Sequence, residues 1–392
     1  MDLNTWPAIG FENMPWQPDE TGFPVSRRAR MAARGDYQAS IPLKIANLSV
    51  ALESELVAEI EDATTALVKF DYENGAYAAP FSQILLRSES AASSEVENLT
   101  VNVKNLFLAE LGFSATKNAE IVVDNVSAMR AALALSENLT SDAILKMHQT
   151  LLERSRPDIA GIWRDKPVWI GGNSPHAASF VGPNHTRINE LIDDLLVFIN
   201  RTDLPILAQI AIAHAQFETI HPFEDGNGRT GRAIIQAMLK HLEITNHTVA
   251  PVSAGLLSNT ENYFKALAAY RAGQLKPIIQ TFTNASFKAI NSGKHLMNDL
   301  RSIKEQWQKT LVVRSDSAAR KLLELLPQQP IVSVDLVQKN LKISAPAATA
   351  AIAQLEKQNI LTPINSNRRN RIWEAPEIIR ALDNFAERSR RQ

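Results

Sequence analysis

The chain has 392 residues, of which 45% are hydrophobic and 21% charged, a composition that excludes a wholly disordered or fibrous protein and predicts more than one domain. The formal net charge of -1 excludes a global attraction to nucleic acid or to an anionic membrane. The absence of cysteine excludes disulfides, thiolate nucleophiles and cysteine-ligated zinc, and fits a reducing compartment.

The N-terminal segment shows neither an export signal nor a regular period. It lacks the continuous apolar run of a secretory signal, and no stretch of about 18 apolar residues follows that would span a membrane. We therefore expect a cytoplasmic protein without a membrane partner. Residues 1–40 mix tryptophan, proline and glycine without alternation, which predicts an irregular segment that wraps onto a core.

Apolar residues at helical spacing predict a mainly α protein. One helix runs from Ser49 to the breaker Asn74-Gly75, and another opens at Pro80. Further helices are predicted at residues 141–154, 188–200 and 204–215. Between Gly161 and Pro183, β-formers flank a glycine-rich turn, which predicts a hairpin.

The pattern changes after a boundary at about residues 288–315. Three short helices are predicted at residues 318–326, 333–341 and 345–358, and apolar flanks at 360–373 enclose a polar, arginine-rich turn. Three helices followed by a two-stranded wing resemble a winged helix-turn-helix. We expect an N-terminal helical region at 1–115, a catalytic core at 116–295 and this module at 310–392.

The segment from His221 to Arg232 carries the chemistry. Gly226 and Gly228 allow backbone amides to approach a ligand closely, and the following helix adds its positive N-terminal end. Arginines at 229 and 232 can reach the same side and bind phosphate oxygens. Asp225 offers a carboxylate for Mg²⁺, and His221 can accept a proton near neutral pH. The sequence of this loop therefore predicts a general base, a metal ligand and an anion-binding site.

The same segment resembles the signature of the Fic family, H-x-F-x-D-G-N-G-R-x-x-R, at every defined position. The resemblance implies a Fic helical core with a β-hairpin flap, and a protein adenylyltransferase that moves AMP from ATP to a Ser, Thr or Tyr hydroxyl. It makes His221 the base and Asp225 the Mg²⁺ ligand, with Phe223 pointing into the core. The implied nucleotide-binding residues of the loop are Asp225, Gly226, Asn227, Gly228, Arg229, Thr230, Gly231 and Arg232.

A second motif, upstream of the signature, resembles the inhibitory helix of the same family, [S/T]-x-x-x-E-[G/N]. Ser93, Glu97 and Asn98 stand at its defined positions. The resemblance implies that Glu97 pairs with Arg232, displaces the γ-phosphate and holds ATP in an unproductive pose. By itself such a short motif is equally typical of a solvated helix face.

Two further regions complete the predicted site. The hairpin at 166–181 occupies the place of the family's flap, which pairs with an extended target segment. Its residues predicted to lie near the nucleotide are Ile170, Gly171, Gly172 and Asn173. Tyr263 and Phe264 resemble the aromatic wall of the adenine pocket, although core packing explains these two residues almost as well.

Other functions stay open at this point. A basic excess after residue 311, with Arg368, Arg369 and Arg371 in the wing, is compatible with a DNA-binding regulator, but an alanine-rich recognition helix is equally typical of protein docking. A Fic loop of this kind can also serve an enzyme that uses another nucleotide or removes AMP. A homodimer is left open as well.

Overall fold

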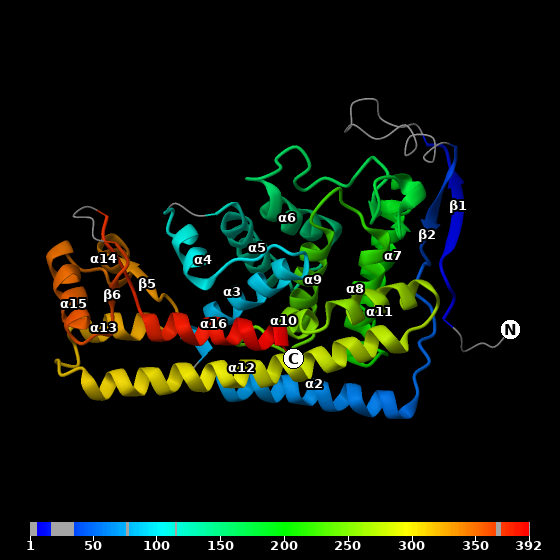
Figure 1. Cartoon of the computed structure of the whole chain (residues 1–392). Helices are drawn as coiled ribbons and strands as arrows, with labels where there is room; N and C mark the ends of the chain where they lie inside the picture. Colours follow the sequence, from blue (N-terminus) through cyan, green and yellow to red (C-terminus); the bar gives the residue numbers. More distant parts are fainter. Residues whose placement is uncertain (1–5, 17–34, 76–77, 114–115, 366–369, 392) are drawn as a thin grey trace. The chain divides into compact units, whose positions relative to one another are not determined.

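The computed structural model describes residues 6–16, 35–75, 78–113, 116–365 and 370–391 (Figure 1). It is mainly helical with a few small sheets, which confirms the predicted fold class. No helix in the described ranges has both the length and the apolar character needed to cross a membrane.

Contacts divide the chain into two compact units that do not follow chain order. The first unit contains Met1–Thr64, Ala128–Leu242 and Thr260–Thr283, and the second contains Thr65–Ser127, Glu243–Asn259 and Asn284–Gln392. The boundaries predicted at residues 115, 295 and 310 therefore stay predictions.

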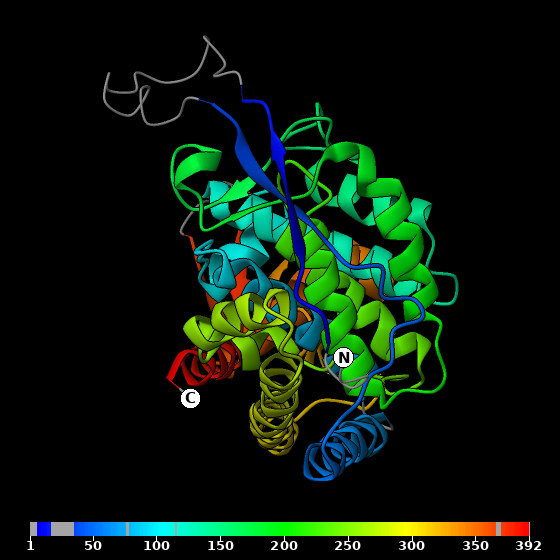
Figure 2. The same ribbon diagram turned by 90° about the vertical axis from the view of Figure 1, so that its right-hand side faces the viewer.

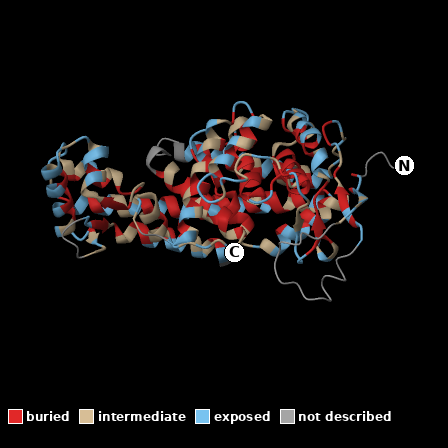
Figure 3. Ribbon diagram, turned by 90° about the horizontal axis from the view of Figure 1, so that it is seen from above, coloured by how far each residue is buried: buried red, intermediate tan, exposed pale blue. Residues whose placement is uncertain are grey.

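The first unit is built around one buried helix. Its helices are α6 (Ser141–Leu152), α7 (Ile188–Ile199), α8 (Ile206–Ile220), α9 (Asn227–His241) and α11 (Thr260–Arg271). Helix α8 is buried from Leu207 to Ile220 and contacts α7, α9 and α11. Buried residues gather inside the helical layers (Figure 3). A helix that is buried on all sides needs neighbours on all sides, so α8 gives the unit its centre.

The predicted hairpin is confirmed. Strand β3 (Trp169–Ile170) pairs antiparallel with β4 (Phe180–Val181), and the short 3-10 helix η1 (Pro175–Ala177) lies in the connection. The predicted helices of this unit are confirmed too, with α8 continuing to Ile220, where the signature begins.

The prediction of an irregular segment over residues 1–40 was wrong at residues 10–14 and 37–40, while residues 1–5 and 17–34 lie outside the described residues. Strand β1 (Gly10–Met14) pairs antiparallel with β2 (Tyr37–Ile41), and this ribbon lies along the first unit in front of its green helices (Figure 2). Each strand has five residues, too few to show alternation among nearby prolines and glycines. Trp16 continues the ribbon onto the hairpin, with its ring edge-on to Tyr37 at 5.9 Å and to Trp169 at 5.7 Å.

The second unit contains the helix of the upstream motif and the C-terminal module. Helix α3 (Ala78–Val96) contacts α10 (Val252–Leu257) and α16 (Pro376–Arg391), and α4 (Val103–Glu110) contacts α16. The long helices α2 (Ser54–Gly75), α5 (Lys117–Ala134) and α12 (Lys276–Thr310) have residues in both units.

The C-terminal module has short helices near the predicted positions and a small sheet. The helices are α13 (Ala318–Leu325), α14 (Val334–Leu341) and α15 (Ala345–Lys357), and the strands β5 (Ile331–Ser333), β7 (Ile372–Glu374) and β6 (Thr362–Pro363) pair in the order β5-β7-β6. Arg368 and Arg369 lie outside the described residues. The winged-helix assignment stays a prediction.

A buried carboxylate on α2 organises one loop of the second unit. Asp71 is 4% exposed and accepts hydrogen bonds from the backbone N–H groups of Asn246, His247 and Thr248 at 2.7 to 3.1 Å. The Thr248 hydroxyl donates to it as well, at 2.9 Å. Both oxygens of Asp71 therefore accept hydrogen bonds, and every one of these partners is an N–H or O–H donor.

We expect Asp71→Asn to lower the free energy of unfolding by roughly 2 kcal/mol, because the new amide N–H₂ would face N–H donors and leave them unpaired. Urea denaturation measures this difference. Asp62→Asn, at an exposed position of the same helix, is the control and should stay near the parent. Equal stabilities for the two variants would contradict the assigned role of Asp71.

Candidate active site

A short loop between α8 and α9 carries the signature residues. His221 caps the end of α8 in the left-handed conformation, with φ 49°, and its N–H donates to the Phe217 carbonyl at 2.9 Å. Gly226, with φ 77°, precedes the first residue of α9. A Cβ at position 226 would lie 3.0 Å from Leu151 Cδ2, so both the backbone conformation and the space favour glycine. The loop thus turns sharply at each end.

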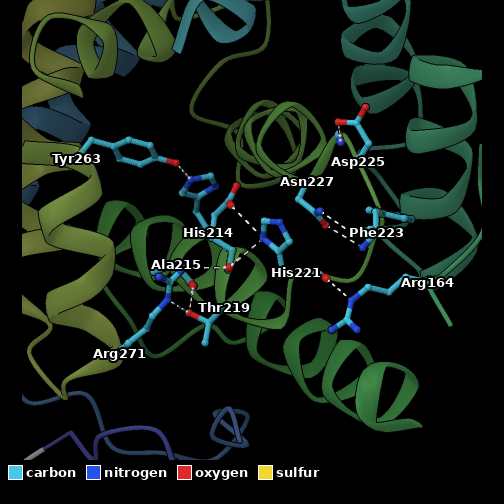
Figure 4. A network of polar contacts seen from close by, with 12 residues as sticks. Arg164, His214, Ala215, Thr219, His221, Phe223, Asp225, Asn227, Tyr263 and Arg271 are labelled. Atoms are coloured by element: carbon cyan, nitrogen blue, oxygen red, sulfur yellow. Dashed lines mark hydrogen bonds and ion pairs between the residues drawn. The ribbon is translucent and has the colours of Figure 1, made fainter. Parts of the chain in front are cut away.

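Asn227 closes the loop through a pair of reciprocal hydrogen bonds. The Phe223 N–H donates to Asn227 Oδ1 at 2.9 Å, and Asn227 Nδ2 donates to the Phe223 carbonyl at 2.8 Å (Figure 4). Phe223 is fully buried, as predicted, and its ring stacks on His148 at 3.6 Å and on Trp163 at 4.8 Å. The predicted role of Asn227 in nucleotide binding stays a prediction, and in this structure its side-chain amide holds the loop.

His221 lies in a buried setting that keeps its imidazole neutral. Its side chain is 17% exposed, and burial, followed by the charges of Arg271 and Arg164, lowers the pKa of His221 to about 3. Its Nδ1 lies 3.4 Å from the Glu218 carbonyl. An Nδ1–H donor in that contact leaves the lone pair on Nε2, the arrangement that a proton acceptor requires.

Positive charge gathers on the first two turns of α9. The side chain of Arg229 is 4% exposed, and its Nη2 lies 3.3 Å from Asp225 Oδ1. Arg232, one turn later, is 1% exposed. The first N–H groups of a helix lack partners within the helix, so the two guanidinium groups and the helix end together suit an anion with several oxygens.

Asp225 is the carboxylate at the defined position of the signature, and its side chain is 50% exposed. It accepts a hydrogen bond from the Gly226 N–H at 2.6 Å. Among the described residues, no group of three or more His, Asp or Glu side chains could hold a metal ion. A single exposed carboxylate does fit Mg²⁺, which keeps most of its shell for water and substrate phosphates.

The residues outside the loop that were predicted to lie near the nucleotide differ in their exposure. Tyr263 is 1% exposed, and its hydroxyl lies 2.7 Å from His214 Nε2, so it supports α8 from the core. Phe264 is 53% exposed. On the hairpin, Ile170 is 39% exposed, and Gly171, Gly172 and Asn173 are exposed as well. Their contact with a nucleotide stays a prediction.

The upstream motif belongs to the second unit. Ser93 is buried on α3, Glu97 is half-buried just beyond the helix, and Asn98 is exposed and adopts φ 62°. The Glu97 N–H donates to the Ser94 carbonyl at 3.0 Å. The inhibitory role of these residues stays a prediction.

Sequence reasoning missed Arg164 and Arg271. Arg164 is 5% exposed, and its Nε donates to the His221 carbonyl at 2.8 Å (Figure 4). Arg271, on α11, donates to the Glu218 carbonyl at 3.2 Å and stacks on the Phe180 ring at 3.6 Å. Neither residue belongs to the signature, and the contact that each makes with the end of α8 or the start of the loop joins residues more than fifty positions apart.

The Fic/DOC family profile matches residues 138–239, which contain this loop. The chain is 30% identical over 144 residues to protein adenylyltransferase fic-1 of Caenorhabditis elegans, covering 37% of this chain and 26% of that protein. It is 26% identical over 157 residues to protein adenylyltransferase Fic of Nematostella vectensis, covering 40% and 34%. The chain thus spans about a third or less of these curated relatives.

A solved structure shares the fold over most of the chain. A Fic family protein from Desulfovibrio desulfuricans G20 superposes with a TM-score of 0.54 and 18% identity, covering 83% of this chain and 97% of that one. At this identity the likeness concerns the fold alone.

The buried histidines predict a pH-dependent stability. Burial and the charge of Arg232 lower the pKa of His214 to about 3, whereas an unfolded histidine titrates at about 6.5. Between these values the unfolded chain holds a proton that the folded chain does not. The free energy of unfolding should therefore fall as pH drops below about 6.5, by up to about 1.4 kcal/mol per pH unit for each such histidine.

Denaturation at pH 7.5, 6.5 and 5.5 tests this for His214→Gln, whose stability should fall less steeply with decreasing pH than that of the parent. His185→Gln, at an exposed position, is the control and should follow the parent. A parental slope in His214→Gln would show that His214 does not contribute to the pH dependence.

Proposed function

We propose that this chain, a member of the Fic family through its domain at residues 138–239, transfers AMP from ATP to a hydroxyl group of a protein. The observation that carries the proposal is the place of the buried His221 at one end of a loop, with Asp225 at the other end and Arg229 on the first turn of α9. Relatives named as protein adenylyltransferases support it.

The nucleotide would lie with its phosphates on the N-terminal turn of α9. That turn offers backbone N–H groups and the buried Arg229, and the buried Arg232 follows on the next turn. A polyphosphate needs both directed donors and compensating charge. The residues proposed to bind it are Asp225, Gly226, Asn227, Gly228, Arg229, Thr230, Gly231 and Arg232. Binding of this kind fixes the α-phosphorus before any bond changes, which is a large part of phosphoryl-transfer catalysis.

The transfer step needs one proton acceptor. The acceptor hydroxyl gives its proton to Nε2 of His221 as its oxygen bonds to the α-phosphorus, and the bond to the bridging oxygen breaks to release pyrophosphate. Burial already keeps His221 in the unprotonated form that accepts this proton. Asp225 would hold Mg²⁺, which supplies charge neutralisation on the phosphates when bound.

The protein substrate would dock on the hairpin at residues 166–181. Strand β3 belongs to a sheet of two strands, and an extended segment can add to the outer edge of such a sheet by backbone hydrogen bonds. Exposure of Ile170 next to Gly171 and Gly172 supports this use. The acceptor is a Ser, Thr or Tyr side chain within that segment.

Autoinhibition by Glu97 is the proposed control on this activity. The support is the match of Ser93, Glu97 and Asn98 to the family's inhibitory motif. If the Glu97 carboxylate pairs with Arg232, this arginine is no longer available to bind the γ-phosphate. ATP would then bind with its α-phosphate out of line for transfer.

We expect His221→Ala to lower the rate of AMP transfer by roughly 100- to 10,000-fold, because the proton acceptor is lost. Transfer is measured as label incorporated from ATP tagged on the α-phosphate, into the chain itself and into proteins of a lysate. His185→Ala, at an exposed histidine, is the control. Labelling by His221→Ala at the parental rate would contradict the role of His221 as the proton acceptor. Labelling with another tagged nucleotide but not with ATP would show that ATP is not the donor.

We expect Glu97→Gly to raise labelling at least roughly tenfold, since it frees an arginine for the γ-phosphate. The matched control is Glu95→Gly, which removes an acid two residues earlier that pairs with Arg390 at 2.5 Å. Equal effects of both substitutions would indicate a general loosening of α3 and would contradict inhibition by Glu97.

A further inference from the structure

A buried arginine connects the hairpin to the loop that carries His221. Arg164 is 5% exposed, and its side chain donates to three carbonyl oxygens. Nε donates to His221 at 2.8 Å, Nη1 to Lys166 at 2.8 Å and Nη2 to Pro183 at 2.7 Å. The backbone N–H of Arg164 also donates to the Pro222 carbonyl at 3.0 Å.

These partners have distinct places in the fold. Lys166 precedes strand β3 and Pro183 follows strand β4, so the two residues are the two ends of the hairpin. His221 and Pro222 begin the loop of the signature. One guanidinium therefore holds both ends of the hairpin and the first turn of that loop together.

The chemistry of the guanidinium suits this role. It is planar and presents five N–H donors in fixed directions, whereas a lysine offers one mobile ammonium. Burial lowers the pKa of Arg164 to about 10, so the group stays charged at neutral pH. Leaving three carbonyls without these donors would cost more than the net gain of forming the bonds.

The neighbouring glycine leaves room for it. A Cβ built on Gly182 would lie 2.9 Å from Arg164 Nη2 and 3.4 Å from Val168 Cγ2. Any larger residue at 182 must displace the end of the arginine side chain. Because Gly182 has no side chain, the guanidinium of Arg164 can occupy the space beside it.

We propose that Arg164 is a positioning residue for AMP transfer: it fixes the backbone of His221 relative to the hairpin on which the protein substrate docks. The inference rests on the proposed function of His221 and of the hairpin. The hydrogen bonds of the Arg164 side chain go to backbone carbonyls and not to the side chains of the signature, so Arg164 acts through the position of His221.

The charges around His221 add a second, separable effect. Beside burial, Arg271 from α11 and Arg164 from the segment before the hairpin lower the pKa of His221, while the Glu218 carbonyl from α8 and Asp225 from the loop oppose them. The Glu218 carboxylate also lies 3.8 Å from His221 Nδ1. Removing the charge of Arg164 should thus move the titration of His221 to higher pH. A substitution that keeps the positive charge but loses the planar guanidinium should leave the titration of His221 unchanged.

Three variants in the Glu97→Gly background separate geometry from charge. Arg164→Met should lower kcat roughly 10- to 100-fold through misplacement of His221, with a much smaller change in the KM for ATP. Arg164→Lys should lower kcat by a similar factor, but His221 should still titrate at low pH because the positive charge remains. Gly182→Ala should lower kcat while both charge and arginine remain.

Arg201→Met is the matched control. Arg201 is a largely buried arginine of the same unit that donates to the Leu48 carbonyl at 2.7 Å and pairs with Asp203. It should lose thermal stability and keep kcat. If Arg164→Met does not fold, Arg164→Lys and Gly182→Ala carry the test.

Nuclear magnetic resonance of the labelled His221 ring, without ATP, gives a readout that does not need activity. We expect its titration to move to higher pH in Arg164→Met and to stay low in Arg164→Lys. Parental kcat in all three variants with an unmoved His221 titration would overturn the inference. If the Glu97→Gly parent itself transfers no AMP, the proposed function fails, whereas the ring titration still reports on Arg164.

Discussion

The site depends on the closure of one loop by the side-chain amide of Asn227. Its two hydrogen bonds to Phe223 join the first residue of α9 to the middle of the loop, and the stacked rings of His148 and Trp163 hold Phe223 in the core. Without this closure neither the left-handed turn at His221 nor the one at Gly226 would be fixed. The catalytic geometry is thus determined by packing below the loop as well as by the residues that face a ligand.

Burial shapes the chemistry of the same loop. Burial lowers the pKa of His221, so its neutral form is favoured. The arginines on α9 are buried too, and Arg229 is held beside Asp225 at 3.3 Å. Side chains that burial already holds in place lose little further freedom when a ligand binds, which is a physical reason for this loop to bind phosphate.

Local patterns predicted the helices, the hairpin and the loop, because each is decided by residues close in sequence. Phe223 was expected in the core and lies there. The pairing of β1 with β2 and the role of Arg164 escaped prediction, since both depend on segments more than twenty residues apart. The sequence assigned Asn227 to phosphate, and only the structure reveals that its amide also closes the loop.

The hairpin is held from outside the matched domain. Trp16 and Tyr37 lie before residues 138–239, yet their rings pack around Trp169 and His176 of the hairpin. Arg164 fixes the two ends of the hairpin at its base. If the protein substrate docks there, its fit is set by the N-terminal ribbon together with the domain. A change in the ribbon would then alter the choice of substrate. Because Arg164 joins the hairpin to the loop of His221, such a change would also reach the position of His221.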